Sequence, residues 1–572
     1  MVFQWNYNTP DEAEVGTAAK LAAALGIHPV LGKLLVDRGI TEEAAARKFF
    51  RPKLTDLHSP MLMNDMGKAV QRLSEAIDRH EKIMVFGDYD VDGVTAVALV
   101  YKFLRKRYDN IDYYIPDRYD EGYGIGSKGI DFASGTGVRL IIVLDCGIKA
   151  VEEVAYAKSQ GIDVIICDHH VPDPVLPDAV AILNPKRADN TYPYEHLCGC
   201  GVGFKFMQAF AQARGIAFNE LACVLDLCAV SIASDIVPVT GENRVLAHAG
   251  LHRLNAEPST GLQAIIEVCG LSDKELTMSD IIFKIGPRIN ASGRVQNGRE
   301  AARLLVEEDY VAARQQAESI NLYNEQRKEL DKQMTEEAVT VVRQQEGAES
   351  HSGIAIVGSQ WHKGVIGIVA SRLVEQFHKP AVVLTENNGY ATGSARSVGG
   401  FDVYSAVQSC EDLLQNFGGH TYAAGMTMRS ENVPEFRRRF LKYIDEHISE
   451  EQVQATLEVN GLLELSDVSF KFYQQLSRFA PFGPGNEKPV FCTHSVYDYG
   501  TSKVVGRGQE HIKLELVGEG SSKVIGGIAF GQSSQARYIK TKRAFDICYT
   551  VEENSHKRGE VQLQIEDIRP RE

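Results

Sequence analysis

Short apolar and β-branched runs alternate with helical stretches in the first half of the chain. The runs at 82–86, 139–145 and 163–168 have the length and composition of strands, and the segment 94–107 has the pattern of a helix. Strands that alternate with helices predict a parallel, doubly wound sheet with helices on both faces. We place this first α/β domain at residues 61–300.

The pattern differs outside this region. Residues 1–60 contain two helical patterns and predict a small N-terminal helical segment. Residues 299–345, after the first α/β domain, are free of Gly and Pro and rich in Ala, Glu, Gln and Arg, so they predict one long connecting helix over about 301–350. A second α/β domain is expected at 351–450. Short strands split by turns fill 451–572, and about five strands there suit a small closed or sandwich β module, an OB-like β-barrel being one candidate.

Composition narrows the class of protein. A chain of 572 residues is too long for one hydrophobic core and fits about three or four domains. Its net charge of −15 counts against a protein that coats nucleic acid broadly, so a nucleic-acid partner must be held in a local groove. The apolar runs are far shorter than the ~20 residues of a membrane helix, the first residues lack signal-peptide features, and the cysteines form no CxxC pair. We therefore expect a cytoplasmic protein with no membrane-bound part.

Acidic residues stand at the carboxyl ends of the predicted strands. Asp88, Asp90 and Asp92 follow the first strand, Asp145 ends a later one, and Asp168 ends a third. In open α/β sheets this edge is the crevice where ligands bind, so we expect the carboxylates to converge. Clustered carboxylates repel one another unless divalent cations remove that cost.

Two histidines and a further aspartate, His169, His170 and Asp235, complete a mixed oxygen and imidazole set. Such a set suits Mn²⁺ or Mg²⁺ better than structural zinc. A shared carboxylate such as Asp145 could bridge two ions ~3.5–4 Å apart and create a hydroxide for in-line attack on phosphorus. Taken singly, Asp145 or Asp235 could be a helix N-cap, and the histidines a core pair. Their order on successive strand ends favours a metal centre for phosphoester hydrolysis.

Glycine-rich turns and scattered cations are weaker signals. Turns such as "GSARS" and "FGGH", with backbone N–H groups near an arginine, could hold a phosphate. Other cations could follow a nucleic-acid backbone, although each one alone fits a solvated or salt-bridged side chain better. The C-terminal module mixes Lys and Arg with Tyr and Phe, as single-strand binders do and as ordinary β surfaces also can. The candidate residues are Ser394, Arg396, His420, Arg118, Arg288, Arg294, Lys363 and Arg372.

The order of these motifs resembles a known family. "GDYDVDG", "VLDCG", "CDHH" and "IASDIVP" look like the four successive motifs of the DHH phosphoesterase superfamily, and "WHKGVIGIVASRL", "GSARS" and "FGGHTYAAG" look like its DHHA1 domain. "YIPDRYDEGYGI", "GPRINASGR" and "PFGPGNEKPVF", with the terminal β module, are similar to the RecJ family of bacterial single-strand-specific exonucleases. The similarity runs from about residue 82 to the C-terminus.

The resemblance implies an exonuclease that degrades single-stranded DNA from its 5′ end to mononucleotides, with two Mn²⁺ or Mg²⁺ ions, in DNA recombination and repair. A single-stranded-DNA-binding protein and a helicase are the implied protein partners. Asp145 would bridge the ions, and His170 would contact the scissile phosphate or assist the leaving oxygen. The implied metal ligands are Asp88, Asp90, Asp92, Asp145, His169 and Asp235. The implied substrate-binding residues are Arg118, Arg288, Arg372, Ser394, Arg396 and His420.

One position departs from the superfamily. Many of its small-molecule phosphatases carry a histidine four residues before the first motif aspartate, where this chain has Phe86. The resemblance then assigns the missing ligand to Asp88.

Two other functions remain open. A DHH-type phosphodiesterase for short oligonucleotides or cyclic dinucleotides would resemble residues 82–446, but such enzymes generally need no long helical arm or terminal β module. A non-catalytic nucleic-acid scaffold would tend to lose metal ligands, whereas every acidic and histidine position named above is present. The exonuclease therefore accounts for more of the chain than either alternative.

Overall fold

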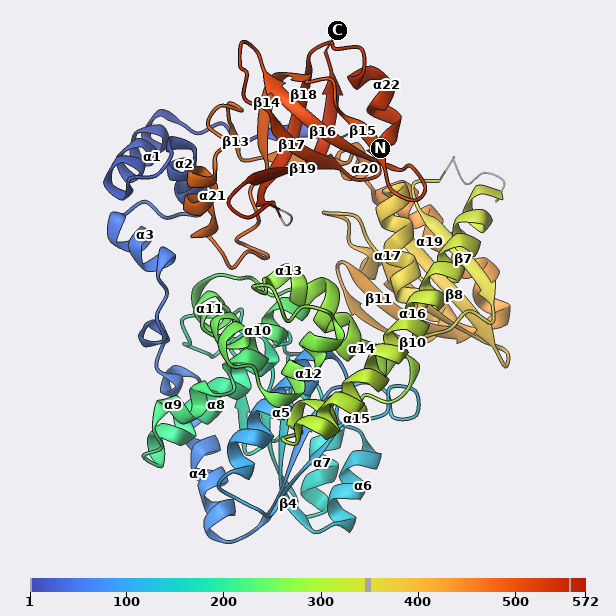
Figure 1. Ribbon diagram of the computed structural model, residues 1–572. Coiled ribbons are helices and arrows are strands. Elements are labelled where there is room, and N and C mark those ends of the chain that lie inside the picture. Colours follow the sequence, from blue (N-terminus) through green and yellow to red (C-terminus); the bar gives the residue numbers. More distant parts are fainter. Residues whose placement is uncertain (1–2, 345–350, 555–556, 572) are drawn as a thin grey trace.

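The computed structural model describes residues 3–344, 351–554 and 557–571. Figure 1 shows an α/β domain (blue to green), a second α/β part (yellow), a β-barrel (orange to red) and N-terminal helices beside the barrel. The expected fold class, a doubly wound sheet joined by helix to a second α/β domain and an OB-like barrel, is confirmed. The domain boundaries drawn from the sequence stay predictions.

The first domain is built on a parallel sheet in the order β3-β2-β4-β5-β6. Its strands are β2 (Lys82–Gly87), β3 (Ile111–Tyr114), β4 (Val138–Leu144), β5 (Asp163–Cys167) and β6 (Ala181–Leu183). Its covering helices are α4 (Met66–Asp78), α5 (Val91–Arg105), α6 (Ser127–Gly135), α7 (Val151–Ser159) and α8 (Gly199–Ala213). Ile83 and Val85 pack with α4, α5 and α8, whereas Met84 and Phe86 pack with α6 and α7. Burial on both faces explains why the strands are continuous apolar runs.

The remainder of this domain is helical. Its elements are α9 (Phe218–Ala222), α10 (Leu225–Ser234), α11 (Gly241–Ala256), α12 (Thr260–Val268), α13 (Met278–Asp280), the π-helix η3 (Ile281–Ile285), α14 (Gly286–Val295) and α15 (Arg299–Val306). Leu227 of α10 and Leu304 of α15 share one core with Val97 of α5. The carboxyl end of α10 is thereby fixed beside the edge of the sheet where the acidic motifs lie.

The long connecting helix predicted from composition is present, but it begins later than predicted because a break separates it from α15. α15 ends before Glu307, and α16 (Tyr310–Gln344) begins three residues later. Glu307 has an extended backbone, and its carboxylate accepts hydrogen bonds of 3.0 Å from the next two backbone N–H groups. Asp309 then caps α16 by accepting a 2.8 Å hydrogen bond from the N–H of Ala312. The predicted residues 345–350 lie outside the described part.

The second α/β part has a mixed sheet in the order β10-β11-β9-β8-β7, in which only β7 and β8 are parallel. Its strands are β7 (Ile354–Ser359), β8 (Ala381–Asn387), β9 (Tyr390–Arg396), β10 (Leu414–His420) and β11 (Ala423–Arg429). Its helices are α17 (Ile366–Phe377), α18 (Val403–Gln408), η4 (Glu411–Leu413), η5 (Ser430–Asn432), α19 (Val433–His447) and α20 (Glu450–Val453). Val383 packs with Val369 of α17 and with α16, whereas Val382 packs with Phe436 of α19. The arm α16 is therefore part of the core of this second sheet.

The C-terminal module is a closed barrel. Its strands are β12 (Thr456–Val459), β13 (Gly461–Leu462), β14 (Phe491–Asp498), β15 (Lys503–Val505), β16 (His511–Gly518), β17 (Ile525–Ala529), β18 (Phe545–Glu553) and β19 (Val561–Pro570), and its helices are α21 (Phe470–Ser477), η6 (Ser533–Gln535) and α22 (Ala536–Ile539). β14 pairs with β18 on one side and with β16 on the other, which closes the circuit β14-β18-β19-β17-β16. Closure removes the free edges that an open sheet would expose.

The N-terminal elements dock on this barrel. They are β1 (Gln4–Tyr7), α1 (Glu12–Leu25), α2 (Pro29–Asp37), α3 (Glu43–Phe50), η1 (Leu54–Asp56) and η2 (Pro60–Leu62). β1 pairs in parallel with β12, and the indole N–H of Trp5 donates to Asp567, 562 residues away, at 2.8 Å. Over the described residues, no single helix is long and apolar enough to cross a membrane; α1 and α2 pass such a test only as a pair bent by 120°.

Arg244 joins three parts of the chain. This side chain on α11 is 4% exposed and donates hydrogen bonds to the carbonyl oxygens of Phe49, Phe479, Ala480 and Pro481. Its guanidinium also lies 3.8 Å from the ring centre of Phe49. The first domain is thus fastened both to α3 and to the segment that leads into the barrel.

We expect Arg244→Met to destabilise the protein by about 3 kcal/mol, because the variant leaves buried carbonyl groups without donors. The melting temperature, followed by circular dichroism, should fall by about 5 °C or more. Arg438→Met is the matched control, since Arg438 is exposed and pairs with Glu435 on its own helix. Equal melting curves for the two variants would contradict the fastening role.

Candidate metal centre

Four side chains from four elements meet at the carboxyl edge of the first sheet. Nε2 of His169, after β5, lies 3.2 Å from Oδ1 of Asp145, after β4. It lies 3.6 Å from Oδ2 of Asp235, at the end of α10, and 3.7 Å from Oδ2 of Asp92, in the first turn of α5. The structure therefore brings together the residues that the sequence placed on separate strand and helix ends.

The start of α8 orients two of these carboxylates. Asp92 accepts hydrogen bonds from the backbone N–H groups of Gly199 and Cys200, at 2.6 and 2.7 Å, and from the hydroxyl of Ser231 at 2.7 Å. A Cβ on Gly199 would lie 2.6 Å from Cβ of Asp145, so only glycine fits there. The positive end of the α8 dipole also favours negative charge at this point. The helix end fixes the position of Asp92 and leaves room for Asp145.

The backbone of Asp145 is in the left-handed region, with φ of 59°. Few non-glycine residues adopt this region, and such conformations gather at functional sites. The N–H of Asp145 donates to the carbonyl oxygen of Cys167 at 2.9 Å, which holds the turn after β4 against β5. The turn places the carboxylate beside His169.

Several buried ligand atoms of this cluster have no hydrogen-bond partner among the residues that the structure describes. They are Oδ1 of Asp145, Oδ2 of Asp235, Oδ2 of Asp88 and both ring nitrogens of His169. Burial and the charge of Asp92 raise the pKa of Asp145 and of Asp235 well above the usual carboxyl value, and burial lowers the pKa of His169 to about 4. Unpartnered oxygens with a neutral imidazole fit a hard divalent cation, which would remove the repulsion.

The donor atoms form two overlapping sets. One contains Asp145, His169 and His170, and the other contains Asp92, His169 and Asp235; within each set the ligand atoms lie within 4.8 Å of one another. The two sets share His169, so they could hold two neighbouring ions. Two-metal phosphoesterases hold Mn²⁺ or Mg²⁺ ions in this way.

Asp168 orients the histidines. Its Oδ1 accepts from the backbone N–H of His169 at 2.7 Å and from Nδ1 of His170 at 2.7 Å, and its Oδ2 accepts from the N–H of Ile148 at 2.9 Å. Although burial opposes the charged form, the hydrogen bond and charge of His170 lower the pKa of Asp168 to about 2. Nε2 of His170 lies 3.4 Å from the hydroxyl of Tyr123. Asp168 is therefore an anionic support for the His170 ring.

The two remaining aspartates of the first motif lie beside the centre. Asp90 caps α5 by accepting from the N–H of Gly93 at 3.0 Å, and its charge contributes to the raised pKa of Asp145. Asp88 is 1% exposed. Neither belongs to the two donor sets, so their assignment as ligands stays a prediction. Phe86 is buried and stacks on Tyr114, which makes its position a core position.

Three arginines gather where the two α/β parts meet. Nη1 of Arg294 donates to the carbonyl oxygen of Gly364 at 3.1 Å, and Nη1 of Arg396 donates to the hydroxyl of Ser394 at 2.8 Å. Burial and then the charge of Arg118 lower the pKa of Arg396, and burial with Arg118 and other arginines lowers that of Arg294 to about 10. Within the described part of the chain, no carboxylate forms an ion pair with any of the three. This cation cluster, Arg118, Arg294 and Arg396, is available to an anion.

His420 ends β10 on the same side of the second sheet as Arg396: it pairs with Ala423 of β11, which in turn pairs with Arg396 of β9. Burial lowers the pKa of His420, and the charges of Arg396 and His170 lower it further. From the sequence, His420 and Arg396 are predicted to bind substrate, whereas Arg294 is only one of several scattered cations. Arg294 differs from the other scattered cations because it lies near Arg118 and Arg396, and the sequence alone does not show this.

Two of the predicted substrate-binding residues have partners within the chain. Arg288 donates to the side chain of Asn321 on α16 and to the carbonyl oxygen of Lys284, both at 2.8 Å. Arg372 is half exposed and pairs with Glu375 at 3.0 Å. Their roles in substrate binding stay predictions.

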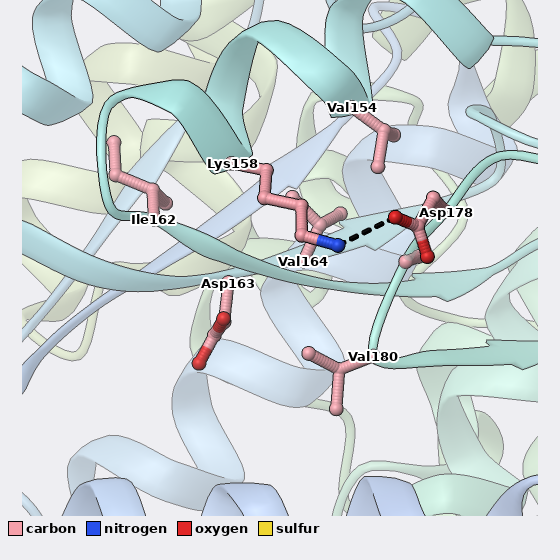
Figure 2. Close-up of a pocket in the computed structure, with 8 residues that line it drawn as sticks. Val154, Lys158, Ile162, Asp163, Val164, Asp178 and Val180 are labelled. Atoms are coloured by element: carbon pink, nitrogen blue, oxygen red, sulfur yellow. Dashed lines mark hydrogen bonds and ion pairs between the residues drawn. The ribbon is translucent and has the colours of Figure 1, made fainter.

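A separate cavity of about 100 Å³ lies at the opposite edge of the first sheet (Figure 2). Asp163 and Val180, at the amino ends of β5 and β6, line it, and the ammonium of Lys158 crosses it to reach Asp178 at 2.5 Å. Because ligands bind at the carboxyl ends of such strands, this cavity is not part of the metal centre.

Family models match three segments of the chain. The model described as DHH family, N-terminal domain, matches residues 82–232, the DHHA1 domain model matches 351–446, and the RecJ OB domain model matches 459–567.

Curated relatives match most of the chain. It is 38% identical over 521 residues to the single-stranded-DNA-specific exonuclease RecJ of Bacillus subtilis (strain 168), an alignment that spans 91% of this chain and 65% of that protein. It is 32% identical over 577 residues to the protein of that name in Salmonella typhimurium, spanning 97% of this chain and 98% of that protein. The crystal structure of RecJ in complex with Mn²⁺ from Thermus thermophilus superposes with a TM-score of 0.84 at 25% identity, covering 100% of this chain and 80% of that chain.

The contact between α8 and the centre predicts that Gly199→Ala weakens metal binding. The added methyl would push against Cβ of Asp145, so the affinity for Mn²⁺ should fall by about 10- to 100-fold, measured by calorimetry. Gly67→Ala is the matched control, because this helical glycine of the same domain has its nearest neighbour, a methionine methyl, at 3.8 Å. Unchanged Mn²⁺ affinity in Gly199→Ala would show that α8 does not set the ligand geometry.

Proposed function

The chain belongs to the RecJ family of single-stranded-DNA-specific exonucleases, and on that basis we propose that it removes mononucleotides from the 5′ end of single-stranded DNA with two Mn²⁺ or Mg²⁺ ions. The observation that carries the proposal is a cation cluster without carboxylate partners near a set of metal ligands of which several buried atoms, in Asp145, His169 and Asp235, have no hydrogen-bond partner among the described residues. One group holds an anion and the other supports hydrolysis of a phosphodiester.

The cation cluster suits a terminal phosphate. A 5′-phosphomonoester carries more negative charge than an internal phosphodiester, and arginine forks bind such groups through paired N–H donors. The Arg396 fork is fixed by its hydrogen bonds to Ser394 and to the carbonyl oxygen of Ala395, both at 2.8 Å. A strand anchored there would present its next phosphodiester to the metal centre on the side of His170, which Tyr123 and Tyr89 connect with Arg118.

Bound metal ions would activate water and stabilise the charge that develops on the phosphate. Asp92, Asp145, His169 and Asp235 are the residues that would hold them. The resemblance to the family gives Asp145 the bridging role. Burial lowers the pKa of His170, but its hydrogen bond to Asp168 and the nearby carboxylate charges raise it overall. The raised pKa favours a protonated ring, and this ring would donate to the scissile phosphate or to the leaving oxygen.

The contact between the two α/β parts favours a single strand over a duplex. Beside the cation cluster, the hydroxyl of Tyr119 donates to the carbonyl oxygen of Arg294, and a Cβ on Gly364 would lie 2.4 Å from that hydroxyl. Lys363 covers the Tyr119 ring at 4.2 Å. Parts that approach this closely would leave space for a strand threaded past them and none for a paired helix.

The barrel and the wider setting complete the proposal. Tyr499 and Phe530 are more than half exposed on the barrel, as stacking platforms for single-stranded bases would be. A single-stranded-DNA-binding protein and a helicase are the proposed partners, and recombination and repair the proposed processes. The proposed compartment is the cytoplasm, where the ten free cysteines would stay reduced.

Asp145→Asn should lower the rate of single-stranded DNA hydrolysis by about a thousandfold or more, since the bridging carboxylate is lost. The measurement is release of labelled mononucleotide in Mn²⁺, with circular dichroism to verify the fold. Activity within about tenfold of the parent would contradict the two-metal scheme.

Arg396→Met tests the end-anchoring role. We expect KM for a 5′-phosphorylated strand to rise by about 10- to 100-fold, while KM for the same strand with a 5′-hydroxyl stays nearly constant. Arg429→Met, at an exposed arginine of the same α/β part, should change neither value. An equal rise for both substrates would place the arginine on the strand in general, and not on its end.

A further inference from the structure

Ile236 combines two unfavourable features. It follows α10 with a left-handed backbone, φ of 58°, where glycine or asparagine is usual and a β-branched residue is strongly disfavoured. Its side chain is also 65% exposed, although it is wholly apolar. An isoleucine at this position therefore favours neither the end of the helix, where glycine would suit the backbone, nor the hydrophobic core, from which its side chain is exposed.

The chain holds this residue firmly on both sides. The N–H of Asp235 donates to the carbonyl oxygen of Ser231 at 2.9 Å. The carbonyl oxygen of Pro238 accepts from the hydroxyl of Tyr194 at 3.1 Å and from the amide of Asn243 at 3.0 Å. A backbone fixed at both ends sets the direction of the side chain between them, so the exposed position of Ile236 is built into the fold.

Ile236 lies between the metal centre and the approach to the barrel. Its predecessor Asp235 is a member of the donor set around His169. Three residues further on, the N–H of Val239 donates to the carbonyl oxygen of Pro484 at 2.7 Å, in the loop that leads into the barrel. This short segment thus connects the site of hydrolysis with the barrel.

The cation cluster lies on the His170 side of the centre. The guanidinium of Arg118 lies 4.9 Å from the ring centre of Tyr89, whose ring packs on that of Tyr123. The Tyr123 hydroxyl lies 3.4 Å from Nε2 of His170. His170 belongs to the donor set that lacks Asp235. A strand whose 5′-phosphate binds the cation cluster would therefore cross the centre and leave over Asp235 and Ile236.

We propose that Ile236 packs against the base of the second nucleotide, on the 3′ side of the scissile bond, and so holds the strand in register; this inference rests on the function proposed above. The face of every base is apolar enough for such a contact, so it needs no particular sequence. The contact accounts for both the exposure of the side chain and the retention of a disfavoured backbone conformation.

The test pairs variants of Ile236 with substrates that lack the proposed contact. Ile236→Gly and Ile236→Asn suit a left-handed backbone and remove the apolar side chain, whereas Ile236→Val keeps it. His378→Gly is the matched control, since His378 ends α17 with a left-handed backbone and lies in the other α/β part. The substrates are a 5′-phosphorylated single strand and the same strand with an abasic site at its second nucleotide, and the readout is kcat/KM for release of the first nucleotide.

On the normal strand, Ile236→Gly and Ile236→Asn should lower kcat/KM by about tenfold, with melting temperature and Mn²⁺ affinity at or above the parent values. The abasic site should slow the parent by a similar factor and slow these variants by less than about twofold, because the contact is already lost. Ile236→Val and His378→Gly should behave as the parent does.

Full activity in Ile236→Gly, or effects of variant and abasic site that multiply, would overturn the contact and leave Ile236 as a strained helix end. A parent protein that releases no nucleotide from the normal strand would instead refute the proposed function itself.

Discussion

Mutual repulsion among buried carboxylates at one edge of the first sheet is the constraint on which the site depends. The fold relieves this repulsion for some of the carboxylates and leaves it for others. Asp92 and Asp168 receive hydrogen bonds from backbone N–H groups, a serine and a histidine, so their charge is balanced by the protein. Asp145 and Asp235 keep buried oxygens without partners in the described part of the chain, and burial with the charge of Asp92 raises the pKa of both carboxyl groups. A pair of divalent cations would balance the charge of such carboxylates.

The close approach of separate elements supports this arrangement. Gly199 lets the start of α8 touch Asp145, and Gly364 lets the second α/β part touch Tyr119 and Arg294. Arg244, on α11 of the first domain, fastens that domain to the segment that leads into the barrel, through hydrogen bonds to backbone carbonyl groups. The metal centre, the cation cluster and the barrel are consequently held in fixed relation, as a nuclease that follows one strand through several contacts requires.

Much of the fold follows from local patterns in the sequence. The parallel sheet and its acidic edge are predictable, because each strand is a continuous apolar run that ends in a carboxylate. The break before α16 is not, since it depends on hydrogen bonds made by Glu307 and Asp309, residues that also suit a helix. The pairing of β1 with β12 joins segments more than 400 residues apart, which no local pattern reveals. Within α14, Arg288 and Arg294 are six residues apart and face different directions, so only the structure shows that Arg294 joins the cation cluster.

End-specific digestion of single-stranded DNA tests the central claim most directly. A strand of about fifty nucleotides, longer than several single-strand binding sites, would be labelled at either its 5′ or its 3′ end and incubated with Mn²⁺ or with EDTA. The account predicts labelled mononucleotide at once from the 5′-labelled strand, only late from the 3′-labelled strand, and none in EDTA. An intact long strand together with rapid hydrolysis of a dinucleotide control would contradict it and indicate a phosphodiesterase for short substrates.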